Sequence, residues 1–145
     1  MKDFIETRII STVQKLLTEK VNEMLGDTEY HIPLIEFSDY QGRSAITPVI
    51  SLSSCEQTEK ERIIRLDAYS LTITFPLPEM PESEFYCYAY SGAVGKAFFD
   101  DPTLGGVVDR AVITDKKYNK PKKSGTGEGW ELVITLRITV EGLRK

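Results

Sequence analysis

The sequence has very little of the two residue types that most often build metal sites. Among its 145 residues are one histidine, His31, and two cysteines, Cys55 and Cys87. The cysteines lie in unlike contexts without the spacing of metal ligands, and one histidine cannot complete a Cys/His zinc set. We therefore predict no metal and no cofactor, and we interpret both cysteines as free thiols in a reducing compartment.

The chain also lacks a long apolar run and an excess of basic residues. Its first six residues include acids where a secretory signal needs a basic start, and no later stretch approaches about 18 uninterrupted apolar residues. With 18 basic against 22 acidic residues the formal charge is −4, which does not suggest a dedicated nucleic-acid binder. We expect a soluble cytoplasmic protein without a membrane partner, folded as a single domain over residues 1–145.

The first half of the chain predicts one helix and three strands. Residues 4–25 carry apolar side chains at three- and four-residue steps, which indicates an amphipathic helix stopped by Gly26. Residues 30–37 and 45–52 are strand-like but contain Pro33 and Pro48, so we expect edge strands or bulges there. The charged residues 55–62 predict an exposed loop. Residues 62–76 predict a long strand whose apolar phase shifts, as a bulge or a change of buried face would produce.

Residues 81–100 predict an aromatic-rich helix with Pro81 in its first turn. Its apolar side chains cover nearly the whole circumference, and Gly92 and Gly95 suggest that another backbone passes close by. One interpretation is a helix buried within a single chain. We favour a helix buried partly by a second subunit. The candidate contact residues are Phe85, Tyr86, Tyr90, Ala93 and Ala97.

A turn, a loop and two strands complete the chain. Asp101 before Pro102 ends the helix, and a structural turn follows at Pro102, Leu104, Gly105 and Gly106. Residues 107–114 and 130–142 predict strands, the second with strict apolar alternation. Residues 115–129 between them predict a mobile hairpin loop. We expect its lysines to dock a partner: Lys116, Lys117, Lys120, Lys122 and Lys123. The elements together predict an α+β fold, with two α-helices packed on a mainly antiparallel sheet of about four to five strands.

No pattern in the chain indicates reaction chemistry. Residues 92–97 lack the spacing of a phosphate-binding loop and lie inside a predicted helix. The glycine-rich residues 125–129 open a strand, so no helix N-terminus is available to hold a pyrophosphate. His31 has no acid-base partner in view, and Asp100 and Asp101 are typical of a helix-terminating turn. The sequence therefore argues against an enzyme.

Two segments resemble the tail-terminator and minor tail proteins of long-tailed bacteriophages and prophages. They are residues 101–109, which read DPTLGGVVD, and residues 131–142, which read ELVITLRITVEG. The order of the other elements fits the same layout. The resemblance implies a ring, usually a hexamer, that docks on the end of the tail tube, stops polymerisation of the tube protein and faces the head connector. It implies a place in the virion tail, with assembly in the cytoplasm of the bacterial host and DNA only in passage.

Two alternatives stay open at this point. A head-tail joining, or neck, protein belongs to the same machinery, and it stays open because residues 31–62 have no counterpart in the resemblance. A small ligand-binding domain or enzyme would instead use Tyr86, Tyr88 and Tyr90 as one wall of a pocket.

Overall fold

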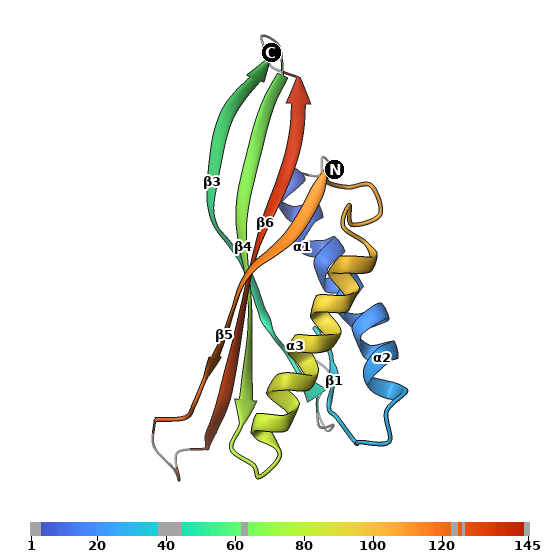
Figure 1. Ribbon diagram of the computed structural model, residues 1–145, viewed down its shortest axis with the longest axis vertical. Helices are drawn as coiled ribbons and strands as arrows, with labels where there is room; N and C mark the ends of the chain where they lie inside the picture. The colour runs from blue at the N-terminus through green and yellow to red at the C-terminus, as the bar shows by residue number, and fades with distance from the viewer. Residues whose placement is uncertain (1–3, 38–44, 62–63, 123–124, 126, 144–145) are drawn as a thin grey trace.

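The computed structural model describes residues 4–37, 45–61, 64–122, 125 and 127–143 (Figure 1). Two helices pack on one face of a four-stranded antiparallel sheet of order β3-β4-β6-β5, and a two-residue parallel pair lies apart from it. The predicted α+β class, with two helices and a mainly antiparallel sheet, is confirmed. None of the described helices is long and apolar enough to cross a membrane.

The N-terminal helix is continuous but changes its pitch. It consists of α1 (Ile5–Leu16), a π-helical turn η1 (Leu17–Val21) and α2 (Asn22–Gly26). The buried side chains Ile9, Val13 and Leu17 form its core face, as the periodicity predicted. Beyond the π turn, the Asn22 side chain donates to Ile35 O at 2.9 Å and accepts from Ile35 N at 2.8 Å. These two bonds attach the short strand β1 to the helix.

Of the strand predicted at residues 30–37 only two residues form β1, the strand predicted at 45–52 is divided into β2 and the start of β3, and the charged loop is a strand. β1 (Leu34–Ile35) and β2 (Ala45–Ile46) form the parallel pair. The prediction of an exposed loop at residues 55–62 was wrong, because β3 runs without a break from Val49 to Glu61. Its side chains are exposed from Cys55 to Glu59, and its backbone pairs with β4, with bulges between Leu52 and Ser54 and between Glu59 and Glu61. Backbone pairing thus overrides the low strand propensity of its charged residues.

The centre of the sheet consists of β4 (Ile64–Pro78) and β6 (Glu128–Leu143), which pair in unbroken register from Ile64 to Pro76. The shift in the apolar pattern of β4 is therefore not caused by a bulge in its pairing with β6. Alternate side chains of both strands face the helices and are fully buried, as the alternation in β6 predicted. They are Leu71, Ile73, Phe75, Leu132, Ile134, Leu136 and Ile138.

Three strands continue past the ends of the helices (Figure 1). We call this segment the projecting end: residues 56–61 of β3, 64–68 of β4 and 139–143 of β6. The rest of the sheet, which lies under the helices, is the covered part. In the projecting end the described side chains are mostly exposed or half-buried, and Asp67 and Ala68 are the buried exceptions.

β5 (Arg110–Asn119) pairs with β6 and forms one edge of the sheet. The loop predicted at residues 115–129 was therefore placed too early, since the strand continues to Asn119 and β6 begins at Glu128. A bulge between Ile113 and Asp115 changes which residues face the helices. It directs Lys116 and Tyr118 to the helix side, opposite Ile134 and Leu132.

Candidate subunit interface

The predicted interface helix, α3 (Ser83–Asp100), lies across the sheet and beside the N-terminal helix. It begins at Ser83, two residues later than Pro81 predicted. Ser83 Oγ accepts a hydrogen bond from Trp130 N at 2.9 Å, and a Cβ at Gly129 would lie 2.2 Å from Pro78 O. The helix start is thus fixed tightly against the start of β6.

Two of the five candidate contact residues lie inside the protomer. Tyr90 is fully buried, stacks on Phe75 with ring centroids 5.0 Å apart, and donates its hydroxyl proton to Pro33 O. Burial raises the pKa of Tyr90 far above its ordinary value. Ala97 is 3% exposed. The prediction that these two meet a second subunit was wrong, because the sheet and the N-terminal helix of the same chain cover them.

The other three candidates lie at the outer surface of the helical layer. Phe85 is 41% exposed, and its ring packs against Tyr30 at 4.9 Å. Tyr86 is half-buried, and its hydroxyl donates to His31 O at 3.4 Å. Phe85 and Ala93 line a groove of about 410 Å³ between α2 and α3. Its other lining residues are Met24, Leu25, Thr28, Tyr30, Ile32, Ala89, Gly92 and Lys96.

The two glycines of α3 have different surroundings. In the described part of the chain a Cβ at Gly92 would meet nothing within 4 Å, so no backbone of the same protomer passes close to it, and the approach of a second subunit there stays a prediction. A Cβ at Gly95 would lie 3.1 Å from Lys116 Nζ. The approaching group is therefore a side chain of β5, and Lys116 Nζ donates to Ser91 O at 2.9 Å.

The predicted lysine surface divides into strand and turn residues. Lys116 and Lys117 lie on β5 and not in a loop, Lys120 and Lys122 follow the strand, and Lys123 lies outside the described residues. Lys116 does not face a partner as predicted, because the bulge in β5 directs its side chain onto α3.

An exposed aromatic cluster that the sequence did not predict as a unit lies beside these lysines. Tyr88 contacts Tyr118 with ring centroids at 5.5 Å and Trp130 at 6.1 Å. Lys120 Nζ lies 5.9 Å from the Trp130 ring. The hydroxyl groups of Tyr118 and Ser91 are 2.7 Å apart. The alternation in β6 predicted on which side of the sheet Trp130 lies. The position of Tyr118 on the same side follows from the bulge in β5, which the sequence did not predict.

Residues 102–106 form the turn that the sequence predicted. Leu104 is 1% exposed and has a φ of 52°, while Gly105 and Gly106 have φ of 68° and 91°. Glycine adopts these values without strain, whereas Leu104 is held there by burial. Ala111 N donates to Pro102 O at 2.6 Å, so the turn covers the start of the β5 edge.

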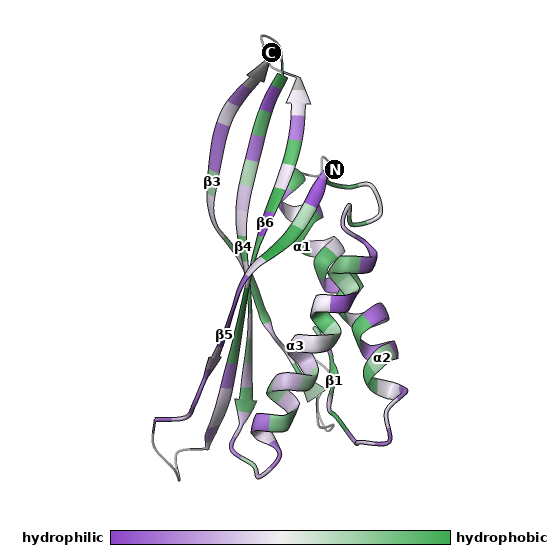
Figure 2. Cartoon of the chain, viewed as in Figure 1, coloured by the Kyte–Doolittle hydropathy of each residue, from purple (hydrophilic) through white to green (hydrophobic). Residues whose placement is uncertain are grey.

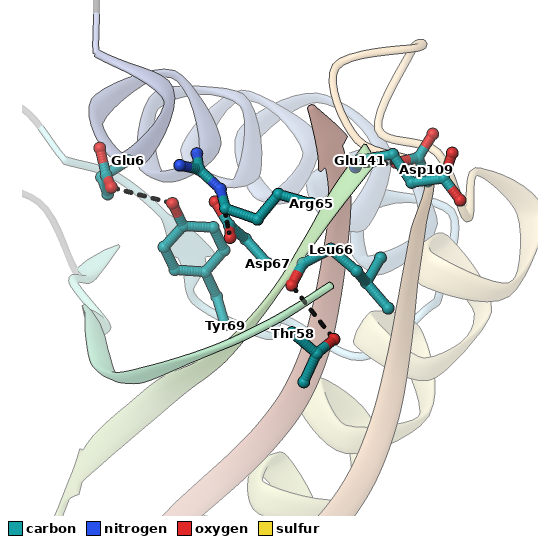
Figure 3. Close-up of polar contacts among 8 residues, drawn as sticks. All are labelled: Glu6, Thr58, Arg65, Leu66, Asp67, Tyr69, Asp109 and Glu141. Carbon is teal, nitrogen blue, oxygen red and sulfur yellow. Dashed lines mark hydrogen bonds and ion pairs between the residues drawn. The ribbon is translucent and has the colours of Figure 1, made fainter. Parts of the chain in front are cut away.

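A polar cluster lies where the N-terminal helix meets the projecting end (Figure 3). Tyr69 donates to Glu6 Oε2 at 2.9 Å, and Arg65 Nε lies 3.0 Å from Asp67 Oδ1. Burial, followed by the bond to Glu6, raises the pKa of Tyr69 above its ordinary range. No pattern in the sequence indicated this cluster, because Glu6 and the β4 residues that it meets are more than 50 residues apart.

The two thiols are both weak nucleophiles at neutral pH. Burial, with the negative charge of Asp67 as the second cause, raises the pKa of the exposed Cys55 thiol. Burial raises the pKa of Cys87 to about 11. Since the thiolate is the reactive form, neither geometry activates a cysteine. Among the described residues, no group of three or more histidine, cysteine or acidic side chains could hold a metal ion.

Neither a protein-family model nor a curated protein matches this chain.

Proposed function

We propose that this chain is a structural protein without catalytic activity, a ring-forming tail terminator of a long-tailed phage or prophage. In this proposal a homo-oligomer, a hexamer by resemblance, caps the tail tube and joins it to the head connector. Its place is the virion tail.

The observation that carries the proposal is the open construction of the sheet. Helices cover one face, while the sheet ends in two long edge strands, β3 and β5. An edge strand presents unpaired backbone groups and is a template for another chain. A protomer with two different open edges suits repeated head-to-tail contacts, which close into a ring when the rotation permits.

Exposed apolar side chains give further support. Phe99 is 83% exposed at the end of α3, and Val49 is 59% exposed at the start of β3. Single exposed apolar residues are ordinary on a monomer. Together with the groove at Phe85, however, they supply contact area for a neighbouring subunit or the tube.

The test is an assembly assay. Mass photometry of the purified protein should give a single species of several subunits, and adding it to polymerising tail-tube protein from the same genome should shorten the tubes. A monomer at high concentration that leaves tube length unchanged contradicts the proposal. Deletion of the reading frame should give tails of abnormal length. Normal tails with DNA-leaking heads would instead identify a neck protein.

A further inference from the structure

The two edge strands run in opposite directions. In the order β3-β4-β6-β5 each neighbouring pair is antiparallel, so β3 and β5 are antiparallel to each other. When one copy follows another beside it in the same orientation, β3 of one copy meets β5 of the next as an antiparallel pair. Antiparallel pairing forms the more stable ladder. The sheet can therefore continue from copy to copy without a change in its pattern.

The edges also carry opposite charge. β3 contains three glutamates and one lysine, a net charge of −2, whereas β5 contains one arginine, two lysines and one aspartate, a net charge of +2. Figure 2 shows the second half of β3 and the second half of β5 mainly in hydrophilic colours, while the first half of each strand contains apolar residues. Among the described side chains, Glu56 and Glu59 are exposed on β3, whereas two bases, Arg110 and Lys117, and one acid, Asp115, are exposed on β5.

The same charges select between the possible pairings. Like charges placed opposite each other destabilise a strand pair, so pairing β3 with β3 is disfavoured. Pairing β3 with β5 can place Glu56 opposite Lys117. A protein with charged edges that merely avoids aggregation needs no such division of sign between its two edges.

We propose that copies of this chain join through these two edges, an inference that rests on the proposed self-assembly. The acidic half of β3 in one copy pairs antiparallel with the second half of β5 in the next copy. The first part of the β5 edge is covered, since Ala111 N donates to Pro102 O. Residues 112–119 follow it, and in the described part of the chain their backbone bonds join them only to β6. This open segment holds the exposed side chains Lys117 and Asp115, while the Lys116 side chain is directed onto α3.

Glu56 and Lys117 suit a direct cross-strand pair. Glu56 is opposite Ala68 in β4, and Lys117 is opposite Val133 in β6, so both lie on the face of the sheet away from the helices. Within one protomer, Lys117 is level with Val49, seven residues before Glu56. Because β3 has a bulge between these positions, they are six residues apart on β4, from Thr74 to Ala68. Pairing Lys117 with Glu56 therefore staggers adjacent copies by about 20 Å along the strands. Such a stagger closes into a ring when the strands tilt, as they do in barrels.

Cysteine cross-linking tests the contact. In a Cys55→Ser background, Glu56→Cys is combined with Lys117→Cys, or with Asn119→Cys to cover a shift of two residues. Opposed residues of an antiparallel pair have Cα atoms about 4.5–5.5 Å apart, within the range of a disulfide. Oxidation should give a ladder of linked species beyond the dimer, because the contact is head to tail. The matched control combines Glu56→Cys with Lys20→Cys, an exposed position on η1, and should give no ladder.

Charge reversal is the second arm. Glu56→Lys or Lys117→Glu alone should raise the dissociation constant about fivefold, and the two together should restore it. Glu19→Lys, at an exposed position of η1, should have no effect. Circular dichroism checks that each variant is folded.

The outcomes separate the two proposals. A wild-type monomer at high concentration overturns both. An oligomer that forms no ladder with either cysteine pair, or that ignores the charge reversals, overturns the edge contact and leaves self-assembly intact. A linked dimer without higher species contradicts the head-to-tail direction.

Discussion

The covered part and the projecting end are formed by the same strands but held together differently. In the covered part, alternate side chains of β4 and β6 are fully buried against α3 and the N-terminal helix. In the projecting end β4 and β6 keep the same register, yet few of the described side chains are buried and the helices do not reach them. The comparison separates two sources of order, which are apolar burial in one part and backbone pairing in the other.

The largest expected effect comes from removing an aromatic ring in the covered part. Phe75 is fully buried and stacks on Tyr90. Phe75→Ala should lower the free energy of unfolding by about 3–5 kcal/mol, because it removes buried area and leaves a cavity. Phe99→Ala, at an 83% exposed position, should change it by about 0.5 kcal/mol or less. Urea unfolding measures both, and equal costs would remove the basis for calling Phe75 a core residue.

A smaller effect is expected from two glycines at opposite ends of β6. A Cβ at Gly129 would lie 2.2 Å from Pro78 O, while one at Gly142, in the projecting end, would meet nothing within 4 Å. Gly129→Ala should therefore cost about 1–3 kcal/mol as the backbone shifts to relieve the clash. Gly142→Ala should be neutral or stabilise by about 0.5 kcal/mol. Thermal unfolding of the two variants compares the regions directly, and the reverse order would contradict the packing at Ser83.

The smallest effect concerns the two thiols. Cys87 is buried in the covered part, and its pKa is raised to about 11 from a reference of 9.0. Because the folded-state pKa is the higher one, its contribution to stability is present below about pH 9 and is lost as pH rises toward 11. Cys87→Ala should make the fall in stability between these pH values less steep. The measured quantity is the slope of the unfolding free energy against pH, because the substitution also changes the absolute stability by removing the buried sulfur atom.

A thiol reagent at neutral pH gives the matching measurement. The exposed Cys55 at the edge of the sheet should react in the folded protein, whereas Cys87 should react only after unfolding. Two reactive thiols in the native protein would mean that α3 opens readily from the sheet.

The sequence predicted most where one local pattern decides the structure. The alternation of β6, the three- and four-residue steps of the N-terminal helix and the glycine turn after α3 each have one physical cause, and all three elements form. The same reasoning failed at Tyr90 and Ala97. Apolar side chains surround α3, so periodicity could not tell which side its own chain covers. It also failed in β3, where a run of charged residues adopts a strand because β4 supplies its hydrogen-bond partners.

The amino-acid sequence by itself determined the fold class, the two helices, the central strand pattern and the division of charge between residues 49–61 and 110–119. The tertiary structure decided that these two charged segments are the opposite edges of one sheet, that a bulge directs Lys116 onto α3, and that Tyr90 is internal. The physical reason is that side-chain period and charge are properties of local sequence. Which strand forms an edge, and which face of a helix is covered, depend on contacts between residues far apart in the chain.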